Sequence, residues 1–201
     1  MSHFIEYIEK TYNPLAIVVY GSYADDTKNQ QSDFDCLIIV DGEGSRHDVP
    51  VVDHVQMDLF VYSKEEIIST TDFSKFVQVH DGVIIKDTDD IALRLKQYVL
   101  EYIDMHQIKS AQEKLASIAW MHKMVERAKR RDVEGLHRHH WLLADSLEIY
   151  FILRDMFYYG PKKSITWLEN NHTDAYDMYA KALKTFAMSD LEDWIAYIIK
   201  T

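Results

Sequence analysis

The sequence predicts an α+β fold, with a mixed β-sheet flanked by helices followed by a C-terminal α-helical bundle. Runs of apolar and β-branched residues typical of strands occur only in about the first 90 residues. From Ile91 onward, apolar residues recur at helical spacing instead. Because Asp87-Thr88-Asp89 can cap a helix, we place the domain boundary there, which gives domains of residues 1–88 and 89–201.

The first domain begins with a helix predicted over Phe4 to Tyr12, which Asn13-Pro14 ends. The elements predicted after it are strands near residues 15–20, 34–40 and 54–61, one or two helices over 64–79, and a last strand at 83–86.

The second domain is predicted to be entirely helical. Its helices are expected to start at Ile91 and then to occupy the stretches near 110–131, 134–158, 164–170, 174–187 and 190–200. Short connections at Asp132, Gly160-Pro161 and Asn170-Asn171 imply antiparallel neighbours, as in a helical bundle.

The first candidate site follows the first predicted strand. Gly21 ends that apolar run and allows the backbone to approach a phosphate where a Cβ would collide. Ser22 adds a hydroxyl, and a helix beginning there would also present unpaired N–H groups to an anion. Alone, a Gly-Ser pair after a strand is usually only a turn.

Three carboxylates extend this candidate site. Asp33 and Asp35 are two apart, so on a strand they lie on one face, while Phe34 points into the opposite layer. Asp58 lies on the less apolar face of the strand over 54–61. Three acids on neighbouring strands can hold two Mg²⁺ ions roughly 3.5–4 Å apart, which suits phosphoryl-type transfer. Singly, each acid could equally be a solvated surface residue.

The order Gly21-Ser22, ten residues, Asp33-x-Asp35 and then Asp58 resembles the nucleotidyltransferase superfamily that includes DNA polymerase beta. The size and the helical second half look most like the small bacterial enzymes that act on aminoglycosides and lincosamides. The motif covers about the first 60 residues. Where those enzymes often have Arg-Gly after the Gly-Ser pair, this chain has Asp25-Asp26.

The resemblance implies transfer of a nucleoside monophosphate from a nucleoside triphosphate, with ATP favoured, to a hydroxyl of a small acceptor, releasing pyrophosphate. Residues 1–88 would form the catalytic domain, and residues 89–201 would select the acceptor and close the cleft. Asp33 and Asp35 would bind two Mg²⁺ ions, or Mn²⁺ as an alternative, and Asp58 would hold the catalytic ion. Gly21 and Ser22 would seat the β and γ phosphates.

Two features of the helical domain bear on this chemistry. Lys163 follows Gly160-Pro161 at a helix N-terminus, where a lysine opposes the helix dipole unless an anion lies there. Related enzymes often present such a lysine to the nucleotide phosphates, although a solvated loop residue is an equal alternative.

Asp145 and Glu148 share a largely apolar helical face. They either meet the acceptor, with Glu148 as general base, or form an internal salt bridge with Arg138 or Arg154, which we favour because buried acids are usually paired.

The composition of the chain limits which kinds of partner we expect it to bind. A net charge of −11 argues against a long nucleic acid, which needs a basic track, and favours a small acceptor. No segment approaches the ~20 apolar residues of a membrane span, and the single cysteine, Cys36, excludes an internal disulfide. We therefore expect a cytoplasmic protein, a monomer or homodimer, that binds no membrane.

Three alternatives stay open. The acceptor could be a protein hydroxyl, as with AMPylating or antitoxin-like nucleotidyltransferases that pair with helical toxins. The chain could be a nucleotide-binding module that has lost catalysis, or a template-using polymerase, which the charge disfavours. Likeness to antibiotic-modifying enzymes does not by itself make the chain a resistance enzyme.

Overall fold

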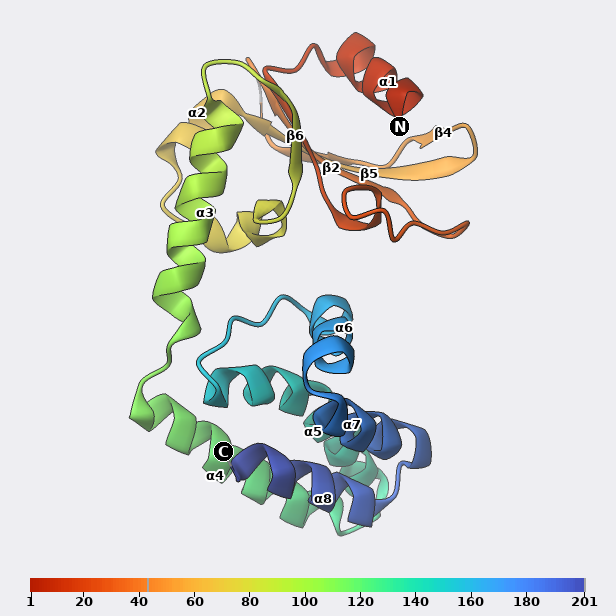
Figure 1. Ribbon diagram of the computed structural model, residues 1–201, viewed down its shortest axis with the longest axis vertical. Coiled ribbons are helices and arrows are strands. Elements are labelled where there is room, and N and C mark those ends of the chain that lie inside the picture. Colours follow the sequence, from red (N-terminus) through yellow and green to blue (C-terminus); the bar gives the residue numbers. More distant parts are fainter. Residues whose placement is uncertain (43, 201) are drawn as a thin grey trace. The chain divides into compact units, whose positions relative to one another are not determined.

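The computed structural model describes residues 1–42 and 44–200 (Figure 1). The chain divides into two compact units, Met1–Ile103 and Asp104–Thr201. The first unit contains the strands, and the second is helical, which confirms the predicted α+β fold class. The first unit thus includes most of a helix that the predicted boundary at 88–89 assigns to the second domain. The functional division at that boundary stays a prediction.

The sheet of the first unit is mixed. In the described residues it contains β1 (Ala16–Val19), β2 (Phe34–Val40), β3 (Arg46–Asp48), β4 (Val51–Val52), β5 (Val55–Ser63) and β6 (Val83–Asp87). The strand order is β3-β5-β2-β1-β6, with β4 paired to β5. Strands β2 and β5 are parallel and the other pairs are antiparallel. The central strands are buried and rich in Val, Ile and Leu, as expected where both faces are covered.

The two faces of the sheet bury different residues. Helix α1 (Ser2–Tyr12) places Phe4 and Ile8 in one cluster with Phe34, Cys36 and other alternate strand residues. On the opposite face, Tyr62 of β5 contacts Phe76 at 4.9 Å between ring centroids. The elements after β5 are α2 (Lys64–Ser69), η2 (Phe73–Val79) and α3 (Ile91–Gln107). Because side chains alternate along a strand, Asp35 lies on the face opposite α1.

Strands β3 and β4 are not predicted by the sequence. Their residues, Arg46-His47-Asp48 and Val51-Val52, lack the apolar alternation that marks a strand. Pairing with β5 supplies their hydrogen bonds instead, and Asp48 accepts from the Tyr12 hydroxyl at 3.0 Å and from Arg46 Nε at 2.9 Å. Tertiary contacts therefore form β3, the strand that contains His47.

The second unit consists of α4 (Ala111–Ala128), α5 (Val133–Leu153), α6 (Pro161–Asn171), α7 (Thr173–Thr185) and α8 (Met188–Ile199). Trp194 is fully buried in its core, and its indole N–H donates to Ser146 Oγ at 2.9 Å. Helix α5 ends five residues before the predicted 158, because Asp155 takes a left-handed conformation (φ 55°). None of the described helices is both long and apolar enough to cross a membrane.

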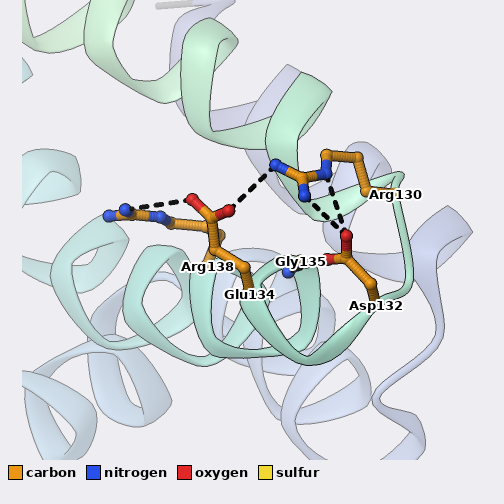
Figure 2. A network of polar contacts seen from close by, with 5 residues as sticks. All are labelled: Arg130, Asp132, Glu134, Gly135 and Arg138. Carbon is orange, nitrogen blue, oxygen red and sulfur yellow. Dashed lines mark hydrogen bonds and ion pairs between the residues drawn. The ribbon is translucent and has the colours of Figure 1, made fainter.

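The junction of α4 and α5 is fixed by charged side chains (Figure 2). Asp132 accepts from the Gly135 N–H at 2.8 Å, which caps α5, and from Arg130 Nη2 at 2.6 Å. Arg130 also bonds Glu134 at 2.9 Å, and Arg138 lies 3.4 Å from Glu134. A Cβ on Gly135 would lie 3.1 Å from the Arg127 carbonyl oxygen, so the glycine permits the close turn. These exposed pairs set the geometry of the turn more than its stability.

Candidate functional site

Three polar residues lie side by side across the centre of the sheet. The parallel register of β2 and β5 places Asp58 directly opposite Asp35. On the other side of β2, the Tyr20 N–H donates to the Asp35 carbonyl oxygen at 3.1 Å, immediately after the end of β1. Residues at matching positions of neighbouring strands point to the same face, so Tyr20, Asp35 and Asp58 form one row.

Gly21 has a structural reason to be glycine that the sequence does not reveal. Its φ is +66°, a conformation that side-chain-bearing residues avoid. A Cβ at this position would overlap Asp35 Oδ2 and lie 3.2 Å from Asp35 Cγ. The glycine therefore makes room for the Asp35 carboxylate. Close approach of a phosphate, the reason predicted from sequence, stays a prediction.

Ser22 lies in a single 3₁₀ turn, η1 (Gly21–Tyr23), and not at the start of an α-helix. The N–H groups of Ala24 and Asp25 are bonded to the Gly21 carbonyl oxygen at 2.9 and 3.3 Å. Ser22 itself is 5% exposed. So short a turn has no helix dipole that could attract an anion. The anion binding predicted for a helix N-terminus at Ser22 is therefore absent here.

Asp33 precedes the strand that holds Asp35. Pairing of β2 with β5 begins at Phe34 opposite Met57, and Asp33 is exposed. Asp33 therefore lies one residue before β2, and its alignment with Asp35 on one strand face stays a prediction. Among the described residues, no group of three or more His, Cys, Asp or Glu side chains is arranged to hold a metal ion. The structure brings Asp35 and Asp58 together, and Asp33 precedes the paired residues of β2.

His47 is a site residue that sequence reasoning missed. Its Nε2 contacts Asp58 Oδ1, and its ring stacks on Phe60 with centroids 4.4 Å apart and an interplanar angle of 13°. The stacking restrains the imidazole, and the contact with Asp58 extends the row of polar residues to β3. A histidine in a polar segment without strand periodicity gives no sequence signal for this position.

Tyr20 is the second missed residue. Burial raises the pKa of its phenol, and the negative charges of Asp35 and Asp58 raise that pKa further. The hydroxyl therefore stays protonated at neutral pH and is available as a hydrogen-bond donor beside the two carboxylates. From sequence, Tyr20 is only the last residue of a predicted apolar strand. Its position beside Asp35 follows from the pairing of β1 with β2.

Asp145 and Glu148 lie in the second unit and are both exposed. With Trp120, Ser117 and neighbouring apolar residues they line a cavity of about 420 Å³. Asp145 accepts from the Trp141 indole N–H at 2.5 Å, and the rings of Trp120 and Trp141 meet edge to face at 5.9 Å.

The internal salt bridge favoured from sequence is wrong. Arg138 pairs with Glu134, and the Arg154 guanidinium lies 3.7 Å from the Tyr150 ring centroid. Both acids are on the exposed side of α5, where a carboxylate does not require a cationic partner.

Lys163 lies in the first turn of α6, after Gly160 (φ 86°) and Pro161. It lines a separate cavity of the second unit together with Ser164 and several aromatic side chains. The predicted contact between Lys163 and nucleotide phosphates stays a prediction.

Comparisons with known proteins identify the family of the chain. No curated protein matches the chain. It is similar to a nucleotidyltransferase-like protein from Exiguobacterium sibiricum 255-15, with 13% identity, a TM-score of 0.41 and coverage of 98% of this chain and 73% of that one. It is also similar to a chain of a toxin–antitoxin structure with AMP-PNP, with 15% identity and a TM-score of 0.36. The match covers 59% of this chain and 94% of that one. The model of the nucleotidyltransferase domain family matches residues 1–125, which include the whole sheet with its adjacent aspartates, and the chain belongs to that family.

Proposed function

We propose that this protein transfers a nucleoside monophosphate from a nucleoside triphosphate, with ATP favoured, to a hydroxyl group of a small-molecule acceptor. The observation that carries the proposal is the register that sets Asp58 beside Asp35, with Gly21 making room for the Asp35 carboxylate. Membership of the nucleotidyltransferase domain family supports the reaction class. The acidic net charge of −11 favours a small acceptor over a long nucleic acid.

The proposed reaction forms one bond and breaks one. The acceptor oxygen bonds to the α-phosphorus, the bond from that phosphorus to the bridging oxygen of the β-phosphate breaks, and pyrophosphate leaves. The proton of the acceptor hydroxyl passes to a carboxylate. Asp58 is our candidate in the sheet, and Glu148 is the alternative in the helical unit. Burial and the charges of Asp35 and Asp58 raise the pKa of Tyr20, so its hydroxyl stays protonated within the same row.

The donor set fits magnesium. Two carboxylates on neighbouring strands offer hard oxygen ligands, and a few such ligands with open positions are what Mg²⁺ requires when a triphosphate completes its coordination. We propose Asp35 and Asp58 as ligands, with Asp33 joining from the residue before β2. When bound, Mg²⁺ would neutralise charge on the triphosphate and lower the pKa of the acceptor hydroxyl.

His47 has a positioning role in this proposal. An imidazole N–H that donates to Asp58 restricts the rotation of the carboxylate, and the stacked Phe60 ring restricts the imidazole in turn. Partners of this kind orient ligands that bind metals directly.

The cavity beside Asp145 and Glu148 is our candidate for binding the acceptor. Its two exposed carboxylates and the Trp120 ring suit an acceptor that carries amino groups as well as hydroxyls, since ammonium groups pair with carboxylates and pack on aromatic faces.

The test is a screen of hydroxyl acceptors with each nucleoside triphosphate and Mg²⁺, in which released pyrophosphate is measured. We expect release with the wild-type protein and a loss of at least about 10²-fold in Asp35→Asn and Asp58→Asn. Asp53→Asn is the matched control, because Asp53 is an exposed acid of the same unit (70% exposed side chain) whose φ of 50° asparagine tolerates.

Two outcomes would redirect or overturn the proposal. Transfer of a labelled nucleotide to a protein band would move the acceptor from a small molecule to a protein hydroxyl. Absence of pyrophosphate with every triphosphate, together with unchanged nucleotide binding in Asp35→Asn, would contradict the proposed activity.

A further inference from the structure

The first unit contains a cavity of about 350 Å³ between α2, η2 and α3 that the proposed reaction does not use. Most of its lining is apolar. Ile68 (64% exposed), Tyr98 (49% exposed) and the half-buried Phe73 present surface to it, and the Phe73 and Tyr98 rings meet at 5.3 Å with an angle of 30°. Ile91 and Leu95, each 2% exposed, close its buried side. The volume lies at the small end for ligand pockets, so the cavity suits a small apolar group.

Arg94 supplies the charge in this lining. The residue is exposed, so a ligand in the cavity can reach its guanidinium. Its side chain forms no hydrogen bond or ion pair with any residue that the structure describes. Asp90 lies four positions earlier in the chain without pairing to it, and Asp72, the residue before Phe73, is paired with Lys75 at 3.8 Å. The guanidinium N–H groups are therefore available to a ligand.

Most other cations of the first unit already have partners. Ion pairs with acids engage Lys28, Arg46, Lys64, Lys75 and Lys86. Lys96 donates to the Gly82 carbonyl oxygen at 2.7 Å, and Lys10 lies in the last turn of α1, where the helix dipole stabilises a cation. Arg94 lies near the start of α3, where the dipole opposes a positive charge. An anionic group at the cavity would therefore compensate a charge that the described residues leave unpaired.

We propose that this cavity binds a short aliphatic carboxylate, with its hydrocarbon chain against Ile68, Phe73 and Tyr98 and its carboxylate on the Arg94 guanidinium. Removal of the chain from water supplies the affinity. The planar guanidinium can bond both carboxylate oxygens at once, which fixes the orientation of the ligand. The site is independent of the nucleotidyl transfer proposed above, because it uses none of the residues of that reaction.

An NMR titration of the isotope-labelled full chain with hexanoate and octanoate tests the proposal. We expect saturable shifts of amide signals from α2, η2 and the first half of α3, with a dissociation constant for octanoate of about 1 mM. Because each methylene removed from water adds affinity, octanoate should bind about three- to tenfold more tightly than hexanoate.

Two pairs of variants separate the contact with the carboxylate from the contact with the chain. Arg94→Gln should weaken octanoate binding about three- to fivefold and leave 1-octanol, the uncharged analogue, within about twofold. Lys75→Gln, at an exposed cation of η2 outside the lining, should change neither affinity. Ile68→Ser should weaken both ligands at least about threefold, and Leu93→Ser, at an exposed position of α3 outside the lining, is its control. All four positions are exposed, so amide signals far from each substitution should keep their wild-type shifts.

Three results would overturn the proposal. The first is the absence of saturation by octanoate up to about 10 mM. The second is equal affinity for octanoate in the wild type, Arg94→Gln and Ile68→Ser. The third is displacement of octanoate by ATP and Mg²⁺ in competition for one site, which would assign the cavity to the nucleotide.

Discussion

Replacing Gly21 with alanine tests whether the Asp35 carboxylate depends on the missing Cβ. An alanine Cβ would overlap Asp35 Oδ2 and lie 3.2 Å from Asp35 Cγ. Either the carboxylate must move or the backbone must leave its φ of +66°. In both cases the row formed by Tyr20, Asp35 and Asp58 is disturbed at its centre.

The magnitude follows from two contributions. A side-chain-bearing residue in the left-handed region costs about 1–2 kcal/mol. Overpacking against the half-buried Asp35 side chain costs about 1–3 kcal/mol more. We therefore expect Gly21→Ala to lower the free energy of unfolding by about 2–5 kcal/mol. A shift of the carboxylate by about 1 Å would also lower the rate of nucleotidyl transfer by about 10²-fold.

Chemical denaturation of four variants separates the contributions. Gly44→Ala is the control for the backbone, because Gly44 has a φ of +56° and no atom within 4 Å of an added Cβ. Asp35→Ala removes the atoms that the new Cβ would meet. In that background Gly21→Ala should cost about as much as Gly44→Ala alone, so Gly21→Ala and Asp35→Ala should be coupled by about 1–3 kcal/mol.

Equal destabilisation by Gly21→Ala and Gly44→Ala in the wild-type background, with no coupling to Asp35→Ala, would refute the reasoning. Glycine would then be required at position 21 for its backbone conformation alone.

Three further predictions concern single residues. Removing the imidazole in His47→Ala should raise the Mg²⁺ concentration needed for half-maximal transfer by about 10–100-fold, and His47→Gln should recover part of the loss; equal constants in all three proteins would exclude a positioning role. Burial lowers the pKa of His139, with Arg131 and His140 adding to the effect, so the folded chain resists a proton that the unfolded chain accepts. Stability should therefore fall by up to about 1.4 kcal/mol per pH unit below about pH 6.5, and His139→Phe should remove this part of the dependence in urea titrations. Burial raises the pKa of the Cys36 thiol, which is 0% exposed, so iodoacetamide should label it only after unfolding, and fast labelling of the native protein, measured by mass spectrometry, would contradict the burial.

Sequence periodicity predicts the central elements because their side chains alternate or recur strongly. Asp35 lies in a strand of apolar, buried residues, and Asp58 lies on the less apolar face of an alternating strand. These patterns predict that the two acids lie on neighbouring strands. They do not predict that Asp35 lies directly opposite Asp58, because the register between β2 and β5 is not encoded in either segment alone.

The parts that sequence missed depend on contacts between distant segments. Strand β3 forms through pairing with β5 and through the bond from Tyr12 to Asp48, so His47 reaches Asp58 without any local signal. The predicted salt bridge of Asp145 with an arginine was wrong for a related reason. The helical pattern of the sequence does not reveal that this side of α5 is exposed to solvent.

The central claim is that the row containing Asp35 and Asp58 carries nucleotidyl transfer. The most direct measurement compares ATP labelled in its α-phosphate with ATP labelled in its γ-phosphate, in the presence of Mg²⁺ and an acceptor. We expect the α-label to move to the acceptor, the γ-label to appear only in pyrophosphate, and Asp58→Asn to abolish both. Transfer of the γ-label to the acceptor, or α-label transfer that survives in Asp35→Asn and Asp58→Asn, would contradict it.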